Sequence, residues 1–345
     1  MQFSSKQRAI AFFLVMIMGL TLAACGAKEK QASESNGQAG ETAKLRNVKI
    51  VLDWTPNTNH TGLYVAKEKG YYEQEGLDVD IIQSTSGDPN TLVGSGKEVQ
   101  FGITVQESLT QARSQGVPIV SLAAILQHNT SGFAAPQSKG IKTPKDFEGK
   151  NYGGWGSPVE EAILRTVMEQ AGADYGKVKN MNIGEADYFT AVKRDIDFAW
   201  VFYGWTGIEA ELRGEPVDML YMNEFAKELD FYTPVIATNE KLIADDPELV
   251  KAFMKATAKG YQDAIEKPEE AADLLLKAVP DLNKELVQAS QKWLSTKYQD
   301  DAPRWGEQKR EVWDNYTKWL VDNKLMEKSI DVDKAFTNDF LPSAK

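Results

Sequence analysis

A regular alternation of short apolar runs and helix-like segments limits the possible folds of this chain more than any other feature. Apolar runs occupy residues 48–52, 78–82, 99–104 and 118–126, and a loop and a helical pattern follow each of the first three. Strands joined in this way pair mostly in parallel, with helices covering the sheet. The rhythm restarts after residue 136, so the sequence predicts an α/β protein with two similar halves.

The first 24 residues differ in composition from the rest of the 345-residue chain. Lys6 and Arg8 precede an apolar run over 9–22, which has the length of a signal-peptide core and is short for a membrane span. Leu-Ala-Ala then precedes Cys25, the only cysteine. This order resembles a lipobox, which implies that residues 1–24 are a lipoprotein signal peptide and that Cys25 carries acyl chains. Residues 25–46 are polar and small, and we expect a flexible tether there.

The charge of the chain argues against a polyanionic partner. The formal net charge is −11, and removal of Lys6 and Arg8 with the signal segment would lower it by two. An acidic surface repels nucleic acid, and it repels anionic membranes as well. We therefore expect no nucleic-acid partner, and membrane association only through a lipid anchor.

Polar and aromatic side chains gather in the loop after the first apolar run. Residues 53–60 read Asp-Trp-Thr-Pro-Asn-Thr-Asn-His and open into a helix that stops at Gly70. In open α/β sheets, ligands bind at the carboxyl ends of strands, where this loop is expected. Tryptophan is also uncommon in an ordinary exposed loop. The loop is therefore a candidate half of a binding site.

A second candidate loop lies in the other half of the chain. Gly154-Trp155-Gly156-Ser157-Pro158 follows a short strand at 151–153. Ser157 and Glu160 have capping-box spacing, with Pro158 at the first helical position. A glycine-rich loop that feeds a helix offers free backbone N–H groups to a ligand. The spacing is not GxGxxG, so a dinucleotide is not indicated.

Several motifs carry a family resemblance that covers about residues 48–325. They are Leu-Asp-Trp-Thr-Pro at 52–56 with His60, Ala-Lys-Glu-Lys-Gly-Tyr-Tyr at 66–72, Glu-Gly-Leu at 75–77, Gly-Ser-Gly at 94–96 and Gly-Ile-Thr at 102–104. Together they resemble the family of thiamin-pyrimidine synthases and their solute-binding relatives. The resemblance implies a type II periplasmic-binding-protein (Venus-flytrap) fold, with two lobes joined by a two-strand hinge. It places lobe 1 at 48–136 plus 237–345 and lobe 2 at 137–236, with crossings near 134–136 and 234–238.

The enzymatic branch of this family is the alternative to a binding protein. Its members resemble this chain but carry a Lys and a His after the third strand, and a cysteine cluster that holds iron. The corresponding positions here are Thr104 and Ser108, and no second cysteine exists. His60 and His128 alone make no metal site or nucleophile–base pair. We therefore expect no enzymatic activity, no catalytic residue, no metal and no cofactor such as pyridoxal phosphate.

The resemblance implies a flat ligand, N-formyl-4-amino-5-aminomethyl-2-methylpyrimidine, delivered to an ABC permease and its ATPase for thiamin salvage. Such a ring needs aromatic faces and a few polar partners. Thiamin and riboflavin remain alternative ligands, whereas a sulfonate or nitrate would need an Arg that these loops lack. The expected protein is a monomer on the extracytoplasmic face of the membrane. The expected ligand-binding residues are Asp53, Trp54, Asn57, Asn59, His60, Tyr64, Gln106, Trp155, Gly156, Ser157, Glu160, Asp187, Tyr188, Trp200 and Tyr203.

Overall fold

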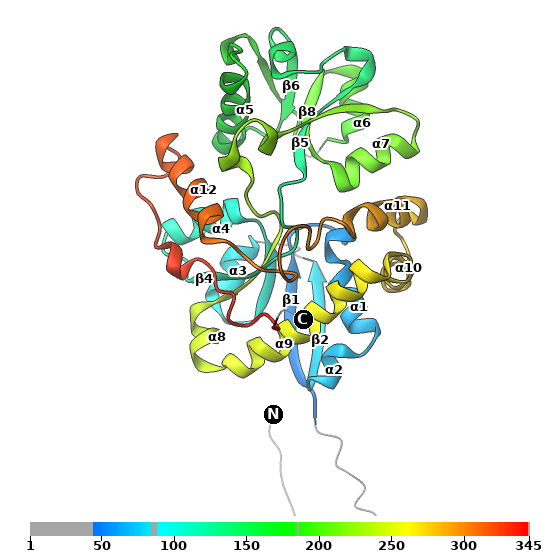
Figure 1. Ribbon diagram of the computed structural model, residues 1–345, viewed down its shortest axis with the longest axis vertical. Helices are drawn as coiled ribbons and strands as arrows, with labels where there is room; N and C mark the ends of the chain where they lie inside the picture. Colours follow the sequence, from blue (N-terminus) through cyan, green and yellow to red (C-terminus); the bar gives the residue numbers. More distant parts are fainter. Residues whose placement is uncertain (1–43, 84–87, 185, 344–345) are drawn as a thin grey trace, which may run out of the picture. The chain divides into compact units, whose positions relative to one another are not determined.

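The computed structural model describes residues 44–83, 88–184 and 186–343 (Figure 1). The expected signal segment 1–24, Cys25 and nearly all of the expected tether 25–46 lie outside these residues. Over the three described ranges, every helix is too short or too polar to cross a membrane.

Five strands form the first sheet, in the order β2-β1-β3-β10-β4. Strand β1 pairs in parallel with β2 and β3, while β10 is antiparallel to both β3 and β4. Buried aliphatic residues occupy β1, as expected for an inner strand covered on both faces, and they also occupy the edge strand β4. The bounds are β1 Arg46–Leu52, β2 Leu77–Gln83, β3 Phe101–Thr104, β4 Ile119–Ala124 and β10 Val235–Asn239.

The second sheet repeats this topology with the order β7-β6-β8-β5-β9. Strands β7, β6 and β8 are parallel, and β5 is antiparallel to both β8 and β9. The two halves predicted from the sequence are therefore confirmed, and each sheet has one antiparallel strand in the fourth position. The bounds are β5 Ser131–Pro136, β6 Asn151–Gly154, β7 Lys179–Asn182, β8 Phe198–Phe202 and β9 Val217–Tyr221.

The crossings between the sheets differ in detail from the sequence-based expectation. Strand β5 lies inside the second sheet, although 48–136 was expected in the first lobe. Strand β10 is an inner strand of the first sheet. Pro234 precedes the strand, so the N–H group that proline lacks is not needed for the backbone hydrogen bonds between strands. The chain thus leaves the first sheet after Ala124 and returns to it at Val235. The exact lobe boundaries stay a prediction.

Helices connect the strands of both sheets (Figure 1). In the first half they are η1 Thr58–His60, α1 Thr61–Glu68, α2 Tyr71–Gln74, α3 Pro89–Ser95 and α4 Gln106–Ser114. In the second half they are η2 Gln137–Lys139, η3 Pro144–Phe147, α5 Pro158–Gln170, η4 Tyr175–Lys177, α6 Tyr188–Arg194, the π-helical turn η5 Tyr203–Gly207, α7 Ile208–Leu212, η6 Met222–Glu224 and η7 Lys227–Leu229. The C-terminal part contains α8 Glu240–Asp245, α9 Pro247–Glu266, α10 Pro268–Ala278, α11 Lys284–Leu294, α12 Arg310–Asp322 and η8 Val332–Lys334.

Helix α12 packs against the cores of both sheets. Trp313 is fully buried in the core of the first sheet. One turn later, Tyr316 and Trp319 pack into the core of the second sheet, and Trp319 Nε1 donates to Thr166 Oγ1 of α5 at 3.1 Å. The C-terminal region 237–345, expected wholly in lobe 1, therefore also contributes to the second core.

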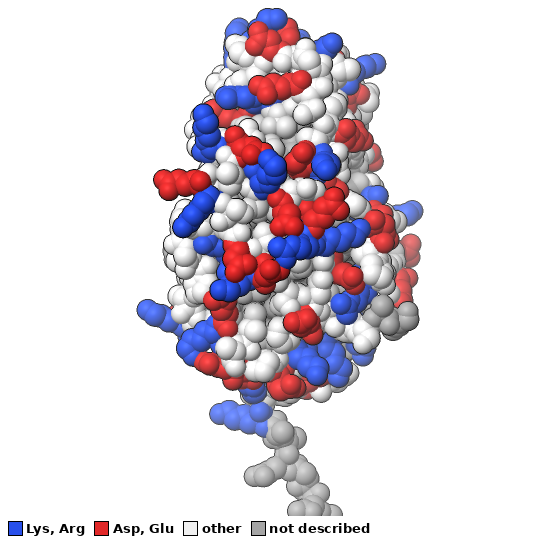
Figure 2. Space-filling view, turned by 60° about the vertical axis from the view of Figure 1, so that its left-hand side comes forward, with Lys and Arg blue, Asp and Glu red and all other residues white. Residues whose placement is uncertain are grey.

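The surface carries charges of both signs. On the face shown in Figure 2, basic and acidic side chains are interspersed over the whole area. The described residues also contain ion pairs, such as Lys69 with Asp263 at 2.8 Å. This pattern is typical of a solvated surface.

Helices α1 and α9 approach each other closely at Gly260, and we expect Gly260→Ala to destabilise the protein. A Cβ atom there would lie 2.0 Å from the carbonyl oxygen of Gly62 and 2.9 Å from Ala66 Cβ. The helices must separate to admit it, at a cost of roughly 1–3 kcal/mol. Urea unfolding measures this cost, with Lys251→Ala on the exposed side of α9 as the control. Equal midpoints for both variants would contradict the prediction.

Candidate functional site

The loop after β1 is fixed by hydrogen bonds among its own residues. His60 is fully buried, and its Nδ1 accepts from the Asn57 backbone N–H at 3.2 Å. Its proton therefore lies on Nε2, which donates to Asp53 Oδ1 at 2.8 Å. The Asn57 side chain caps η1 by accepting from the Asn59 backbone at 2.9 Å. Asp53, Asn57 and His60 thus hold one another, and both ring nitrogens of His60 are used.

Tyrosines and a hydroxyl pair anchor this loop to the C-terminal helices. Tyr261 of α9 donates to the Asn59 carbonyl at 2.7 Å, and Tyr298 donates to the Thr58 carbonyl at 2.6 Å. Thr58 Oγ1 lies 2.6 Å from Ser290 Oγ of α11. The predicted site residue Tyr64 is buried against α10 and α11, where burial raises its pKa to about 12. Tyr64 therefore belongs to the apolar packing that supports this loop.

The indole of Trp54 is the most exposed large apolar side chain of this loop. It is 53% exposed, whereas the neighbouring Leu52 is buried. It follows β1 directly, so it stands at the carboxyl edge of the first sheet. A rigid loop that presents an exposed indole provides a flat face for stacking.

The glycine-rich loop after β6 is occupied by a side chain of its own helix. The carboxylate of Glu160 is 1% exposed and accepts from the Tyr152 hydroxyl at 2.7 Å. It also accepts from the backbone N–H groups of Trp155, Gly156 and Ser157 at 3.1, 3.0 and 3.3 Å. The predicted capping box of Ser157 and Glu160 is therefore confirmed.

This occupation changes the role expected of the loop. Its N–H groups point at Glu160, so they are not free for a ligand carbonyl, and the Glu160 carboxylate is not free for a ligand amino group. Gly154 is required because a Cβ there would lie 2.3 Å from Glu160 Oε1. Gly156 is required because its φ is +81°. Glu160, Gly156 and Ser157 shape the loop that carries Trp155.

Three aromatic side chains form a row at the carboxyl edge of the second sheet. The ring centroids of Trp155 and Trp200 are 5.1 Å apart, and those of Trp200 and Phe202 are 6.5 Å apart. Trp155 is 48% exposed and Phe202 is 40% exposed. Phe202 was not among the expected ligand-binding residues. Strand alternation was the available signal, because residues 200 and 202 share one face of β8.

A second contact joins the strand exits of the second sheet to α11. Tyr203 packs on Trp293 with centroids 5.2 Å apart, and its hydroxyl donates to Glu211. The Ser290 hydroxyl donates to the Gly204 carbonyl and bonds Thr58, which leads back to the first loop. Tyr203 thus links the end of β8 in the second sheet to the C-terminal helix α11.

The start of α4 is the third element at the carboxyl edge of the first sheet. Both ends of the Gln106 amide are engaged: Oε1 accepts from Tyr232 N at 2.8 Å, and Nε2 donates to the Val312 carbonyl at 3.4 Å. Gln106 therefore holds α4 against α12 and is not free to bond a ligand. The next residue, Glu107, was missed by sequence reasoning, because no local pattern distinguishes it from other acidic residues in the first turn of a helix.

Two predicted residues on α6 are not joined to the aromatic row by any contact described here. Asp187 is the N-cap of α6, where the hydrogen bonds from Thr190 lower the pKa of its carboxyl. Tyr188 lines a separate cavity of about 520 Å³ together with Lys139, Lys193 and Glu215. The Asp187 carboxylate therefore serves as a helix cap.

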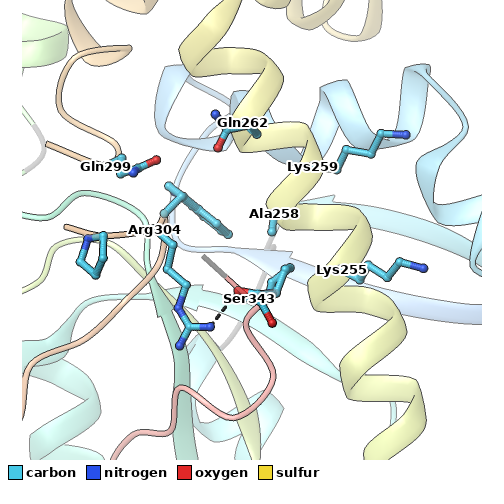
Figure 3. Close-up of a pocket in the computed structure, with 10 residues that line it drawn as sticks. Lys255, Ala258, Lys259, Gln262, Gln299, Arg304 and Ser343 are labelled. Atoms are coloured by element: carbon cyan, nitrogen blue, oxygen red, sulfur yellow. Dashed lines mark hydrogen bonds between the residues drawn. The ribbon is translucent and has the colours of Figure 1, made fainter. Parts of the chain in front are cut away.

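A further cavity, of about 500 Å³, lies beside α9 and contains none of the predicted site residues (Figure 3). Its cations already have partners in the protein. Lys255 pairs with Glu75 at 2.6 Å, and Arg304 with Glu307 at 2.9 Å. Arg304 also turns to the C-terminal segment and donates to the Pro342 carbonyl at 2.7 Å. The described parts of the chain hold no cluster of three or more His, Cys, Asp or Glu side chains suited to a metal ion.

This chain is similar to known proteins both in structure and in sequence. The solved structure of the periplasmic aliphatic sulphonate binding protein SsuA from Escherichia coli is similar, with a TM-score of 0.67 at 13% identity over 87% of this chain and 94% of that one. The fold is therefore the type II periplasmic-binding-protein fold.

Curated relatives extend the similarity to the sequence. The formylaminopyrimidine-binding protein of Halalkalibacterium halodurans is 32% identical over 89% of this chain and 94% of its own length. The 4-amino-5-hydroxymethyl-2-methylpyrimidine phosphate synthase of Legionella pneumophila is 30% identical over 86% and 92%. The family model described as NMT1/THI5 like matches residues 57–271. By family and by fold, this chain is a member of the NMT1/THI5-like proteins.

Proposed function

We propose that this protein is an extracytoplasmic solute-binding protein of an ABC importer for a thiamin-related aminopyrimidine. The observation that carries the proposal is that each sheet presents an exposed indole at the carboxyl edge of its strands, Trp54 on one and Trp155 on the other. The name of the 32% identical relative supports formylaminopyrimidine, N-formyl-4-amino-5-aminomethyl-2-methylpyrimidine, as the ligand.

Each lobe supplies part of this proposed site, so a ligand that touches both favours the closed arrangement. Trp54 from lobe 1 and the row Trp155, Trp200 and Phe202 from lobe 2 stack on the ring. Asp53 and Asn59 line the first half, while His60, Asn57, Glu160 and Gln106 position the loops. A lipid on Cys25 anchors the protein near the permease and its ATPase.

The synthase function of the 30% identical relative is the second candidate. It is less well supported because Thr104 and Ser108 stand where the synthase pattern has Lys and His. Thr104 Oγ1 donates to Asn90 Oδ1 at 2.9 Å and lies 3.2 Å from Ser108 Oγ. These hydroxyls form a local network and supply neither an amine for an aldimine nor a ring base.

Native mass spectrometry with a mixture of candidate ligands tests the proposal. The purified protein is incubated with formylaminopyrimidine, thiamin, 4-amino-5-hydroxymethyl-2-methylpyrimidine and riboflavin at equal concentrations. We expect one aminopyrimidine to be retained in a one-to-one complex. Retention of riboflavin alone, or pyridoxal-phosphate absorbance in the purified protein, would contradict it.

Loss of the Trp54 indole is expected to weaken binding of that ligand at least tenfold. The reason is the lost stacking face, which contributes on the order of 1–2 kcal/mol. Calorimetry of Trp54→Ala measures the change. Leu212→Ala is the control, since Leu212 is 48% exposed at the end of α7 and outside the proposed site. Equal affinities of Trp54→Ala and wild type would refute the role of Trp54.

A further inference from the structure

Glu107 occupies the same sheet edge as Trp54, at the start of α4. It is in the first turn of α4, directly after β3, which runs parallel to β1. Parallel strands end at one edge, so the exits of β1 and β3 are neighbours there. The Gln106 bonds to Tyr232 and Val312 fix the start of this helix. Among the described residues, the half-buried Glu107 carboxyl has no hydrogen bond or ion pair.

Two buried side-chain donors on other elements also lack a partner among the described residues. Tyr316 lies one turn after Val312 on α12, and its fully buried hydroxyl has no partner among the described residues. The pKa of its hydroxyl is raised by burial and, in addition, by the charge of Glu107. The bond from Gln106 to the Val312 carbonyl holds the start of α4 against this turn of α12. The buried Nε1 of Trp200 also lacks a partner within the described ranges. Native proteins rarely leave buried donors unpaired unless a ligand or water completes them.

A second buried carboxylate, Glu160 of the second half, is fully engaged. It accepts from Tyr152 and from three backbone N–H groups, as described above. Burial and the charge of Glu160 raise the pKa of Glu107 to about 7. Near neutral pH the Glu107 carboxyl therefore exists in both forms, and it can accept a hydrogen bond and also share a proton.

We propose that Glu107 is a specificity-determining residue that recognises the amino–ring-nitrogen edge of a 4-aminopyrimidine. One carboxyl oxygen accepts from the exocyclic amino group, and the other shares a proton with the adjacent ring nitrogen. Tyr316 and Trp200 then donate to the remaining acceptors of the ligand. This assignment rests on the proposed function and makes it sharper, because it names the part of the ring that the protein reads.

A ligand without the amino group leaves the acceptor oxygen of Glu107 unpaired. Buried polar sites reject such analogues strongly, whereas apolar pockets do not. The preference for the amino group should therefore depend on Glu107. Gln at this position presents one acceptor and one donor, the same pattern as a neutral carboxyl, so it should keep much of the preference.

Calorimetry with two probes tests this inference. They are 4-amino-5-hydroxymethyl-2-methylpyrimidine and the same ring without the 4-amino group, titrated into wild type, Glu107→Ala, Glu107→Gln and the control Glu161→Gln. We expect wild type and the control to bind the amino probe at least tenfold more tightly. The difference should fall to about threefold or less in Glu107→Ala and remain clear in Glu107→Gln.

Two outcomes would overturn the inference without touching the proposed function. One is an unchanged preference in Glu107→Ala, and the other is wild-type binding of both probes with equal affinity. Wild type that binds neither probe would overturn the proposed function as well. If Glu107→Ala fails to fold, the test depends on Glu107→Gln, which the inference expects to keep a clear preference for the amino probe. Loss of that preference in Glu107→Gln, while the control Glu161→Gln keeps it, would then contradict the inference.

Discussion

Replacing Glu160 by alanine is expected to lower the free energy of unfolding by about 3–5 kcal/mol, because several buried donors lose their acceptor together. Tyr152 and the N–H groups of residues 155–157 all point at this carboxylate. Ligand affinity should fall too, since the loop that carries Trp155 loses its support. Urea unfolding with fluorescence detection measures the stability, and calorimetry measures the affinity.

The neighbouring residue offers a matched control for this prediction. Glu161 is also acidic and also in the first turn of α5, but no hydrogen bond of its side chain occurs within the described residues. Glu161→Ala should change the stability by no more than about 0.5 kcal/mol. Similar losses in both variants would mean that the helix start, and not the loop, determines the effect.

Glu107→Gln is expected to make the unliganded protein more stable at pH 8 and to leave its stability unchanged below pH 4. In the folded chain, burial and the charge of Glu160 raise the pKa of Glu107 from its usual 4.5 to about 7. The unfolded chain therefore releases this proton at lower pH than the folded chain does. As pH rises from about 4.5 to about 7, the wild type loses stability that the glutamine variant keeps.

The size of this effect follows from the shift, reduced because the residue is only half-buried. We expect about 1–3 kcal/mol in favour of Glu107→Gln at pH 8. Urea midpoints of both proteins at pH 4, 5.5, 7 and 8 give the curve. A difference that does not vary with pH, or a variant that is less stable at pH 8, would refute the charged state assigned to Glu107.

The apolar runs at 48–52, 78–82, 99–104 and 118–126 correctly predicted strands β1, β2, β3 and β4. In the C-terminal part, Pro247 and Pro268 stand at the first positions of α9 and α10, so the sequence marks where both helices begin. The edge strands β7 and β9 were missed because 179–182 and 217–221 are short and mixed in polarity, so neither shows a clear period. The membership of β5 in the second sheet depends on long-range pairing, which local patterns do not contain.

Prediction of the candidate site was more successful for side chains that stay exposed than for polar ones. Trp54 and Trp155 stand out in sequence and are exposed in the structure. His60, Gln106 and Glu160 have the chemistry of ligand partners, but the fold uses their polar atoms internally. Glu107 is the opposite case, because no local sequence pattern indicates a role in binding. Only the packing of α4 against α12 shows that its carboxyl has no partner among the described residues.

Titration calorimetry of the purified protein with formylaminopyrimidine, followed by chromatographic analysis of the recovered ligand, tests the central claim most directly. The account predicts saturable one-to-one binding, with the ligand recovered chemically unchanged. An absence of binding at millimolar ligand, or conversion of the ligand to a new product, would contradict it.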